Sequence, residues 1–255
     1  MRATLYQRRT TMLMLLGMIF APLSHGAEIT VAFAGERPPY FFRQNGQDLG
    51  IEIDLIRLIM GNAGHTVKIL NIPKIRLLKS VKENEADGAA TVQENNDEKL
   101  FFTDRYLDFQ NIVISKSKLD IKLKTMSELK HYNFIIWQDG WRNLGPEFEA
   151  EYRPDANGIF PKNYHQAFSQ LSQNKMFWAD RVQLIIIDKT IFEHNKTLLS
   201  KEFDTSAPLT YHDLIKTKTS YSVVFNQASL RDQFNEGLKK IRANGSYQKI
   251  IDSYK

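Results

Sequence analysis

The chain has 255 residues, with 34 lysines and arginines against 29 aspartates and glutamates, and it contains no cysteine. Without cysteine there is no disulfide bond, no thiolate nucleophile and no lipid anchor on cysteine, so the fold must rest on its hydrophobic cores. The length suffices for one large domain or two small ones.

The first residues predict a secretory signal peptide over residues 1–27. Three arginines and no acid precede an apolar run at residues 12–21, and small residues follow up to Gly26 and Ala27. The run is shorter than the ~20 residues of a membrane-spanning helix, which favours a cleaved signal over an uncleaved anchor. Cleavage after Gly26 places small residues at both recognition positions, so it is preferred to cleavage after Ala27. We therefore expect a periplasmic mature protein.

The charge and motif content of the mature chain exclude several classes of partner and cofactor. Residues 28–255 carry 31 basic and 29 acidic side chains, a net charge of +2. They contain no dense basic run interleaved with aromatics, so we expect no nucleic-acid partner. The sequence has no histidine pair at metal-ligand spacing, no Walker loop and no dinucleotide fingerprint, so we expect neither a metal nor a cofactor.

Short apolar runs and helical periodicity alternate through the first half of the mature chain. The predicted strands are residues 29–33, 67–70, 86–90 and 111–115, and the predicted helices are 51–60 and 77–81. Pro38 and Pro39 force a loop after the first strand. This order of strands and helices predicts a largely parallel sheet with helices on its faces.

The same pattern then restarts. Further strands are predicted at 134–137, 182–188 and 221–225, and further helices after Gly140, at 167–171 and at 230–241. The run 182–188 is apolar and β-branched, as a buried parallel strand should be. Gly245 lies where the last helix should stop. Two α/β units in one chain predict two lobes.

Six segments carry a family resemblance in order along the chain. They are Gly35–Phe41 with Gly50–Leu55, Arg76–Leu78 with Asp87, Phe102–Tyr106, Asp180–Asp188, Leu230–Asp232, and Gly245–Ile250 with Tyr254. Together they resemble the family 3 extracellular solute-binding proteins, the polar amino-acid type of periplasmic binding protein. The resemblance covers nearly the whole mature chain.

The resemblance implies an α/β, two-lobed, periplasmic-binding-protein-like fold of type II, in which the chain crosses between the lobes twice. Residues 28–114 and 216–255 would form lobe I, residues 115–215 would form lobe II, and the ligand would lie in the cleft between them. Open α/β sheets bind ligands at the carboxyl ends of their strands, which agrees with this arrangement.

A small zwitterion in such a cleft needs an anion for its ammonium, a cation for its carboxylate and an apolar or stacking surface. Asp188 ends an apolar strand, where a carboxylate meets the cleft rather than the core. In the family the acid at the matching position binds the ligand's ammonium, so the resemblance implies this role for Asp188. The alternative is that Asp188 caps the helix that begins at Lys189 and Thr190.

The residue that binds the carboxylate is left open between two positions. The family usually has an arginine twelve residues after the aspartate matching Asp87 and six before the phenylalanine matching Phe102. The intervening segment is about three residues shorter in this chain, so counting forward gives Lys99 and counting backward gives Asn96. Lysine lacks the planar fork with which arginine grips a carboxylate, and Lys99 could equally be a solvated surface charge.

Arg142 offers a second way to hold an anion, from lobe II. It follows Gly140 and Trp141 at the predicted start of a helix, where free backbone N–H groups favour anions. The family usually has a small hydroxyl residue there, and the alternative for Arg142 is an exposed helix charge.

Aromatic and polar residues near the first strand complete the predicted site. Tyr40 stands at the family's position for a stacking aromatic, and with Phe41 and Trp141 it would form an apolar lining, although such aromatics also occur in cores. Arg37 and Thr91 are further candidate ligand-binding residues, chosen from their positions in the sequence. Thr91 would supply a hydroxyl and a backbone N–H.

These observations predict a monomeric binding module rather than an enzyme. It would capture a small polar solute, close by a hinge motion, and present the closed form to an ABC permease or a membrane receptor. The second hypothesis is a small cleft enzyme of the cyclohexadienyl dehydratase type, in which Asp188 or Glu36 would serve as general acid or base.

Overall fold

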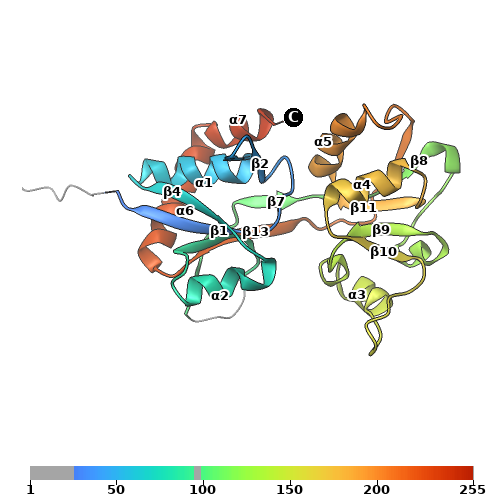
Figure 1. The fold of residues 1–255 in the computed structure, drawn as a ribbon, viewed down its shortest axis with the longest axis horizontal. Coiled ribbons are helices and arrows are strands. Elements are labelled where there is room, and N and C mark those ends of the chain that lie inside the picture. Colours follow the sequence, from blue (N-terminus) through green and yellow to red (C-terminus); the bar gives the residue numbers. More distant parts are fainter. Residues whose placement is uncertain (1–25, 95–98, 255) are drawn as a thin grey trace, which may run out of the picture.

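The chain forms two α/β lobes that lie side by side, each built on one sheet (Figure 1). The computed structural model describes residues 26–94 and 99–254, so residues 1–25 of the predicted signal peptide lie outside the described residues. Within the described ranges no helix is long and apolar enough to cross a membrane.

Lobe I is built on a sheet of order β4-β1-β5-β13-β6, with β7 paired to the start of β13. The strands are β1 (Glu28–Phe33), β4 (Thr66–Asn71), β5 (Gly88–Val92), β6 (Phe101–Phe102), β7 (Leu107–Phe109) and β13 (Thr219–Phe225). β1, β4 and β5 are parallel, whereas β13 runs antiparallel to β5 and β6. The sheet is therefore mixed, whereas the sequence predicted a largely parallel sheet. The reason is that β13, which brings the chain back from lobe II, lies between β5 and β6 in the sheet.

Each face of this sheet has its own helices, because side chains alternate along a strand. Val31 and Phe33 belong to the core cluster that includes α1 and α6, whereas Ala32 belongs to the cluster that includes α2. The helices are α1 (Ile51–Asn62), α2 (Leu77–Lys82), α6 (Ala228–Ala243), α7 (Ser246–Asp252) and the 3-10 turn η1 (Lys74–Arg76). Figure 1 shows α1 and α7 above the sheet and α2 below it.

A small hairpin that the sequence analysis missed extends lobe I toward lobe II. It consists of β2 (Phe42–Gln44) and β3 (Gln47–Leu49), joined by Asn45 and Gly46. Both turn residues have positive φ, 51° and 76°, as a tight two-residue hairpin requires. The ring of Phe42 lies 6.5 Å from the ring of His194 in lobe II.

Lobe II repeats this architecture with the sheet order β10-β9-β11-β8-β12. The strands are β8 (Asn111–Lys116), β9 (Phe134–Trp137), β10 (Tyr164–Ala167), β11 (Leu184–Asp188) and β12 (Leu209–His212). The helices are α3 (Pro146–Tyr152), α4 (Gln170–Trp178), α5 (Lys189–Leu199) and the 3-10 turns η2 (Ser117–Leu119), η3 (Met126–His131) and η4 (Gly140–Arg142). α3 packs in one core cluster and α4 and α5 in another, one on each face of the sheet (Figure 1).

The chain crosses between the lobes twice, and the two crossing segments pair with each other. β7 and the first residues of β13 are antiparallel, with Thr219 opposite Phe109 and Tyr221 opposite Leu107. The first crossing comes earlier than predicted, because β8 pairs with β11 and β12. Residues 111–114, expected in lobe I, therefore belong to the sheet of lobe II.

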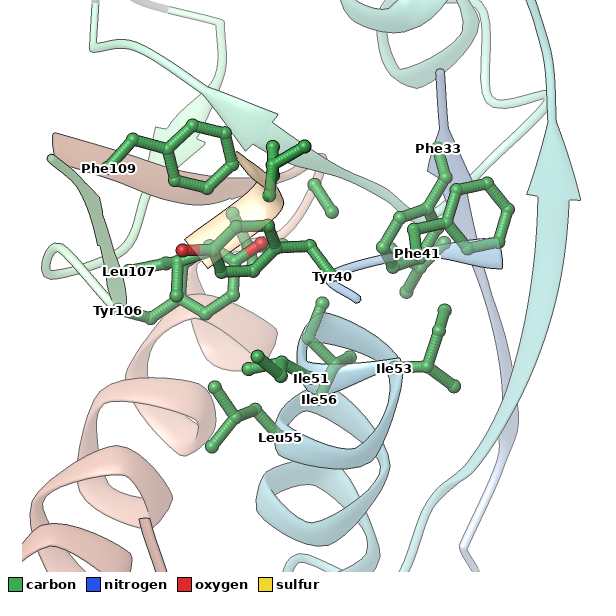
Figure 2. Close-up of a cluster of buried hydrophobic side chains, with 14 of the residues drawn as sticks. Phe33, Tyr40, Phe41, Ile51, Ile53, Leu55, Ile56, Tyr106, Leu107 and Phe109 are labelled. Atoms are coloured by element: carbon green, nitrogen blue, oxygen red, sulfur yellow. The ribbon is translucent and has the colours of Figure 1, made fainter. Parts of the chain in front are cut away.

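The core of lobe I reaches the crossing segments through the loop after β1. Phe41 packs its ring 5.0 Å from that of Phe33, and Tyr40 stacks on Phe109 at 4.4 Å. Figure 2 shows Tyr40 and Phe41 above the start of α1, with the side chains of Ile51, Ile53 and Leu55 from that helix below them.

Two helices predicted in lobe II are present but start later than expected. Gly140 begins only the 3-10 turn η4, and α3 starts at Pro146. Residues 164–167 form β10, and α4 starts after Ser169, whose hydroxyl accepts a hydrogen bond from the Ser172 backbone N–H. Phe168, expected on a buried helical face, is 93% exposed.

Candidate functional site

The carboxyl ends of strands in both lobes meet where the lobes face each other. In lobe I, β1 and β4 end side by side, with Phe33 opposite Asn71, so the loops that follow leave the sheet together. In lobe II, β9 and β10 run parallel to β11, so their ends share the sheet edge with Asp188. This edge faces lobe I, because Asp188 contacts Tyr40.

Tyr40 and Asp188 form a buried polar contact between the lobes. The Tyr40 hydroxyl donates to Asp188 Oδ1 at 3.3 Å, longer than most O–H···O hydrogen bonds. Asp188 is 2% exposed. The same carboxylate accepts from the backbone N–H of Ile191 at 3.0 Å and of Gln110 at 2.8 Å. Asp188 therefore holds the start of α5 and the first crossing segment, and it also touches lobe I.

Burial and hydrogen bonding act against each other on the Asp188 carboxyl. Burial raises its pKa to about 6, while the donors at Ile191, Gln110 and Tyr40 oppose the rise. Burial and the nearby Asp188 charge raise the pKa of Tyr40 above its ordinary value of 10, so its hydroxyl stays a proton donor at physiological pH. The N-cap alternative for Asp188 is confirmed, and its contact with a ligand stays a prediction.

Arg37 is held by a carboxylate that the sequence analysis missed. Its Nη2 lies 2.9 Å from Glu52 Oε1 and 3.1 Å from Oε2, and its Nη1 donates to the Ala34 carbonyl at 2.7 Å. The Thr91 hydroxyl accepts from Arg37 and donates to Glu52. The Tyr106 hydroxyl also donates to Glu52, at 2.8 Å. Arg37 and Thr91, both predicted, are thus brought together in one rigid cluster.

The sequence held a signal for Glu52. Positions 52, 55, 56 and 59 lie on one face of α1. Glu52 is the first of them, and the other three are buried apolar residues. An acid on this apolar stripe predicts a buried partner, because a buried charge must be paired.

Charged residues of both lobes act on Lys74, which the sequence analysis also missed. Lys74 lies in η1, directly after the loop that follows β4. Loss of water around the ammonium lowers the pKa of Lys74, and the positive charges of Arg37 and Arg142 lower it further. Asp139, which also lies in lobe II, opposes them. Charges of both lobes therefore act on Lys74, whose side chain is exposed.

Arg142 and Trp141 differ from their predicted roles in part. Arg142 is exposed, and its guanidinium lies 4.3 Å from the centre of the Trp141 ring. η4 is a single 3-10 turn, so Arg142 does not stand at the start of an α-helix as expected. Trp141 packs in the lobe II core with Phe148 and Tyr152 and is 4% exposed. Its indole therefore has a core role.

Of the remaining predicted residues, one packs in the core, one is exposed and one cannot be placed. Phe41 is fully buried against Phe33, which also gives it a core role. Lys99 is exposed, two residues before the edge strand β6. Asn96 lies outside the described residues, so the choice between Lys99 and Asn96 stays open. Within the described ranges no group of histidine or acidic side chains is arranged to hold a metal.

Comparison with known proteins gives a family match for nearly all of the mature chain. Residues 29–255 match the model of the bacterial extracellular solute-binding proteins, family 3. The arginine-binding extracellular protein ArtP of Bacillus subtilis (strain 168) is 20% identical over 232 residues, which cover 88% of this chain and 84% of that protein.

Solved structures share the fold at low sequence identity. A histidine kinase sensor domain with similarity to periplasmic binding proteins superposes with a TM-score of 0.67 at 19% identity, covering 89% of this chain and 95% of that one. The substrate-binding protein of an amino acid ABC transporter gives a TM-score of 0.63 at 20% identity, with coverage of 89% and 98%. The predicted two-lobed periplasmic-binding-protein-like fold is confirmed.

Proposed function

Because the chain belongs to family 3 of the bacterial extracellular solute-binding proteins, we propose that it captures a small polar solute between its lobes. The solute is an amino acid or a related compound. The observation that carries the proposal is the contact of Tyr40 with Asp188, which joins polar groups of both lobes at the ends of their strands. Relatives support the class of solute, since ArtP is named for arginine.

Capture proceeds by opening and closing of the lobes. In the open form the long hydrogen bond between Tyr40 and Asp188 breaks, and the paired crossing segments β7 and β13 bend. A solute then enters, and closure buries it between groups of both lobes. A ligand favours the closed form by the contacts that it makes there and lacks in the open form.

Each end of an amino acid has a complementary group. Asp188 accepts its ammonium, because Oδ2 has one donor in the structure, Gln110, and a carboxylate oxygen can accept a second. Arg37, held by Glu52, faces its carboxylate. Tyr40 supplies a ring against the apolar part of the solute.

The protein works in the periplasm, where the closed form is recognised by an ABC permease for import. The resemblance to a transporter's binding protein supports this role. The resemblance to a sensor domain supports the alternative of a membrane receptor. Neither role includes turnover of the solute.

A thermal-shift screen of the mature chain against amino acids, organic acids and polyamines tests capture. We expect a saturable rise in Tm with one class of solute, followed by calorimetric titration of the compound that binds. Proton NMR of the solute after long incubation should show it unchanged. Conversion of the solute would replace the binding role by the enzyme alternative, and the lack of any shift across the panel would contradict capture.

A further inference from the structure

We propose that Tyr221, on the segment that returns the chain from lobe II, is a further ligand-binding residue whose hydroxyl donates a hydrogen bond to the carboxylate of the solute. The proposal rests on capture of an amino acid between the lobes. It adds a residue of the crossing segments to the polar groups that the two lobes supply. The sequence predicted Tyr221 only as the start of a strand.

Tyr221 is fixed by contacts with the residues that surround the Tyr40–Asp188 pair. It packs against the core cluster that contains Tyr40 and Tyr106. The ring of Tyr221 lies 5.0 Å from that of Phe109, which in turn stacks on Tyr40 at 4.4 Å (Figure 2). The Tyr221 carbonyl accepts a hydrogen bond from the Tyr106 backbone N–H at 3.0 Å. Tyr221 therefore adjoins two tyrosines that reach charged groups between and below the lobes.

The hydroxyls of these three tyrosines differ in their partners. Tyr40 donates to Asp188, and Tyr106 donates to Glu52. Within the described residues the Tyr221 hydroxyl has no hydrogen-bond partner, although Tyr221 is half-buried. A polar group that loses water without gaining a partner costs free energy, so closure of the lobes favours a solute that supplies one.

The charges that act on Tyr221 belong to the same site. Burial raises the pKa of Tyr221 to about 12; Arg37 opposes this rise, whereas Glu52 and Asp188 add to it. The hydroxyl therefore keeps its proton at physiological pH. A protonated phenol can donate to a carboxylate oxygen, and hydrogen bonds to charged acceptors are the stronger ones.

Arg37 leaves a carboxylate in need of a second donor. A guanidinium has five N–H groups. In Arg37, Nε and Nη2 donate to Glu52, and Nη2 also donates to Thr91. Nη1 donates to the Ala34 carbonyl. One N–H remains, so Arg37 cannot hold a carboxylate by two parallel bonds as a free guanidinium does. The Tyr221 hydroxyl is the donor that completes the contact.

Pairs of solutes that differ in the carboxylate test this role. Calorimetric titration of the mature chain and of Tyr221→Phe would compare L-arginine with agmatine, L-histidine with histamine, and L-glutamine with 4-aminobutanamide. Amines that bind weakly are measured by displacement of the amino acid. We expect Tyr221→Phe to weaken binding of the amino acid by about tenfold and to leave its amine within about threefold, because only the amino acid offers the charged acceptor.

Two controls separate a ligand contact from a structural role. Phenylalanine keeps the ring that packs on Phe109, and the hydroxyl has no protein partner to lose, so Tyr221→Phe should leave the Tm of the chain without solute unchanged. A clear drop in this Tm would assign the hydroxyl to the fold and overturn the proposal. Tyr211→Phe is the matched variant, because its hydroxyl donates to Glu193 on the surface of lobe II. It should leave both affinities unchanged.

The outcomes distinguish this proposal from capture itself. If Tyr221→Phe binds the amino acids as tightly as the native chain does, the role of Tyr221 is overturned while capture stands. An equal loss for an amino acid and its amine, or binding of the amines alone, overturns the contact with the carboxylate. A native chain that binds none of these probes overturns capture and the role of Tyr221 with it.

Discussion

Glu52 and Arg37 form an ion pair in which the carboxylate side chain is completely buried and the guanidinium side chain is 14% exposed. The hydroxyl groups of Thr91 and Tyr106 also donate hydrogen bonds to the Glu52 carboxylate. A charge so deeply buried is stable only with its partners. The Glu52–Arg37 pair therefore stabilises lobe I and also fixes the position of Arg37, which is a predicted ligand contact.

The first prediction concerns this ion pair. Glu52→Gln keeps the shape of the side chain but leaves Arg37 uncompensated, and breaking a buried pair costs about 3–5 kcal/mol. For a chain of this size the loss lowers Tm by roughly 10 °C. Glu236→Gln is the matched control, since the Glu236–Lys240 pair is more than 60% exposed on both sides, and such pairs contribute less than about 1 kcal/mol. Equal effects of the two variants in urea unfolding would contradict the buried role of Glu52.

The second prediction separates the two roles of Asp188. Asp188→Ala removes the cap of α5 and the acceptor for Gln110, and loss of the cap alone costs about 1 kcal/mol. Asp188→Asn keeps a capping oxygen and loses the charge. Both variants should abolish the thermal shift given by an amine ligand, whereas the alanine variant should have the lower free energy of unfolding. An unchanged ligand shift in the asparagine variant would remove Asp188 from the site.

The third prediction follows from the pKa of Asp188, which burial raises to about 6. An unfolded aspartate titrates near 3.9, so between these values the folded state binds more protons than the unfolded state. The Asp188 carboxyl makes its full contribution to the free energy of unfolding below pH ~4. This contribution is lost as the pH rises through ~6, and the loss is roughly 2–3 kcal/mol. Urea unfolding of the native chain and of Asp188→Asn from pH 4 to 7 should show the difference between them shifting in favour of the variant. Parallel pH profiles would refute the shifted pKa.

Local patterns in the sequence were enough to predict several elements but not their partners. β11 and α6 carry their own signals, an apolar β-branched run and an apolar stripe, and both form close to the predicted bounds. β8 was also predicted as a strand. However, the sheet it joins depends on β11 and β12, which come more than sixty residues later.

The errors in lobe II have a similar cause. Gln173 and Asn174 are fully buried on α4, where an apolar period would be expected. The Gln173 amide donates to the Ile186 carbonyl at 2.7 Å, a partner that the helix sequence does not reveal. The missed site residues also depend on distant neighbours: Glu52 lies next to Arg37 only because α1 packs under the loop after β1, and charges from both lobes act on Lys74.

The last prediction tests whether the Tyr40–Asp188 contact holds the lobes together. Tyr40→Phe keeps the stacking on Phe109 at 4.4 Å but removes the hydroxyl that bridges the lobes. Without this hydroxyl the lobes lose a polar link, while the ring contact of Phe42 with His194 spans 6.5 Å, so the unliganded chain should spend more time open. Because the chain has no cysteine, dyes can be attached specifically to Lys239→Cys in lobe I and Lys162→Cys in lobe II. Single-molecule energy transfer should then show a larger low-efficiency population in the Tyr40→Phe background.

Phe109→Leu, which weakens the stacking and leaves the hydroxyl in place, is the companion variant. An effect of Phe109→Leu with none for Tyr40→Phe would assign closure to ring packing instead of the hydrogen bond.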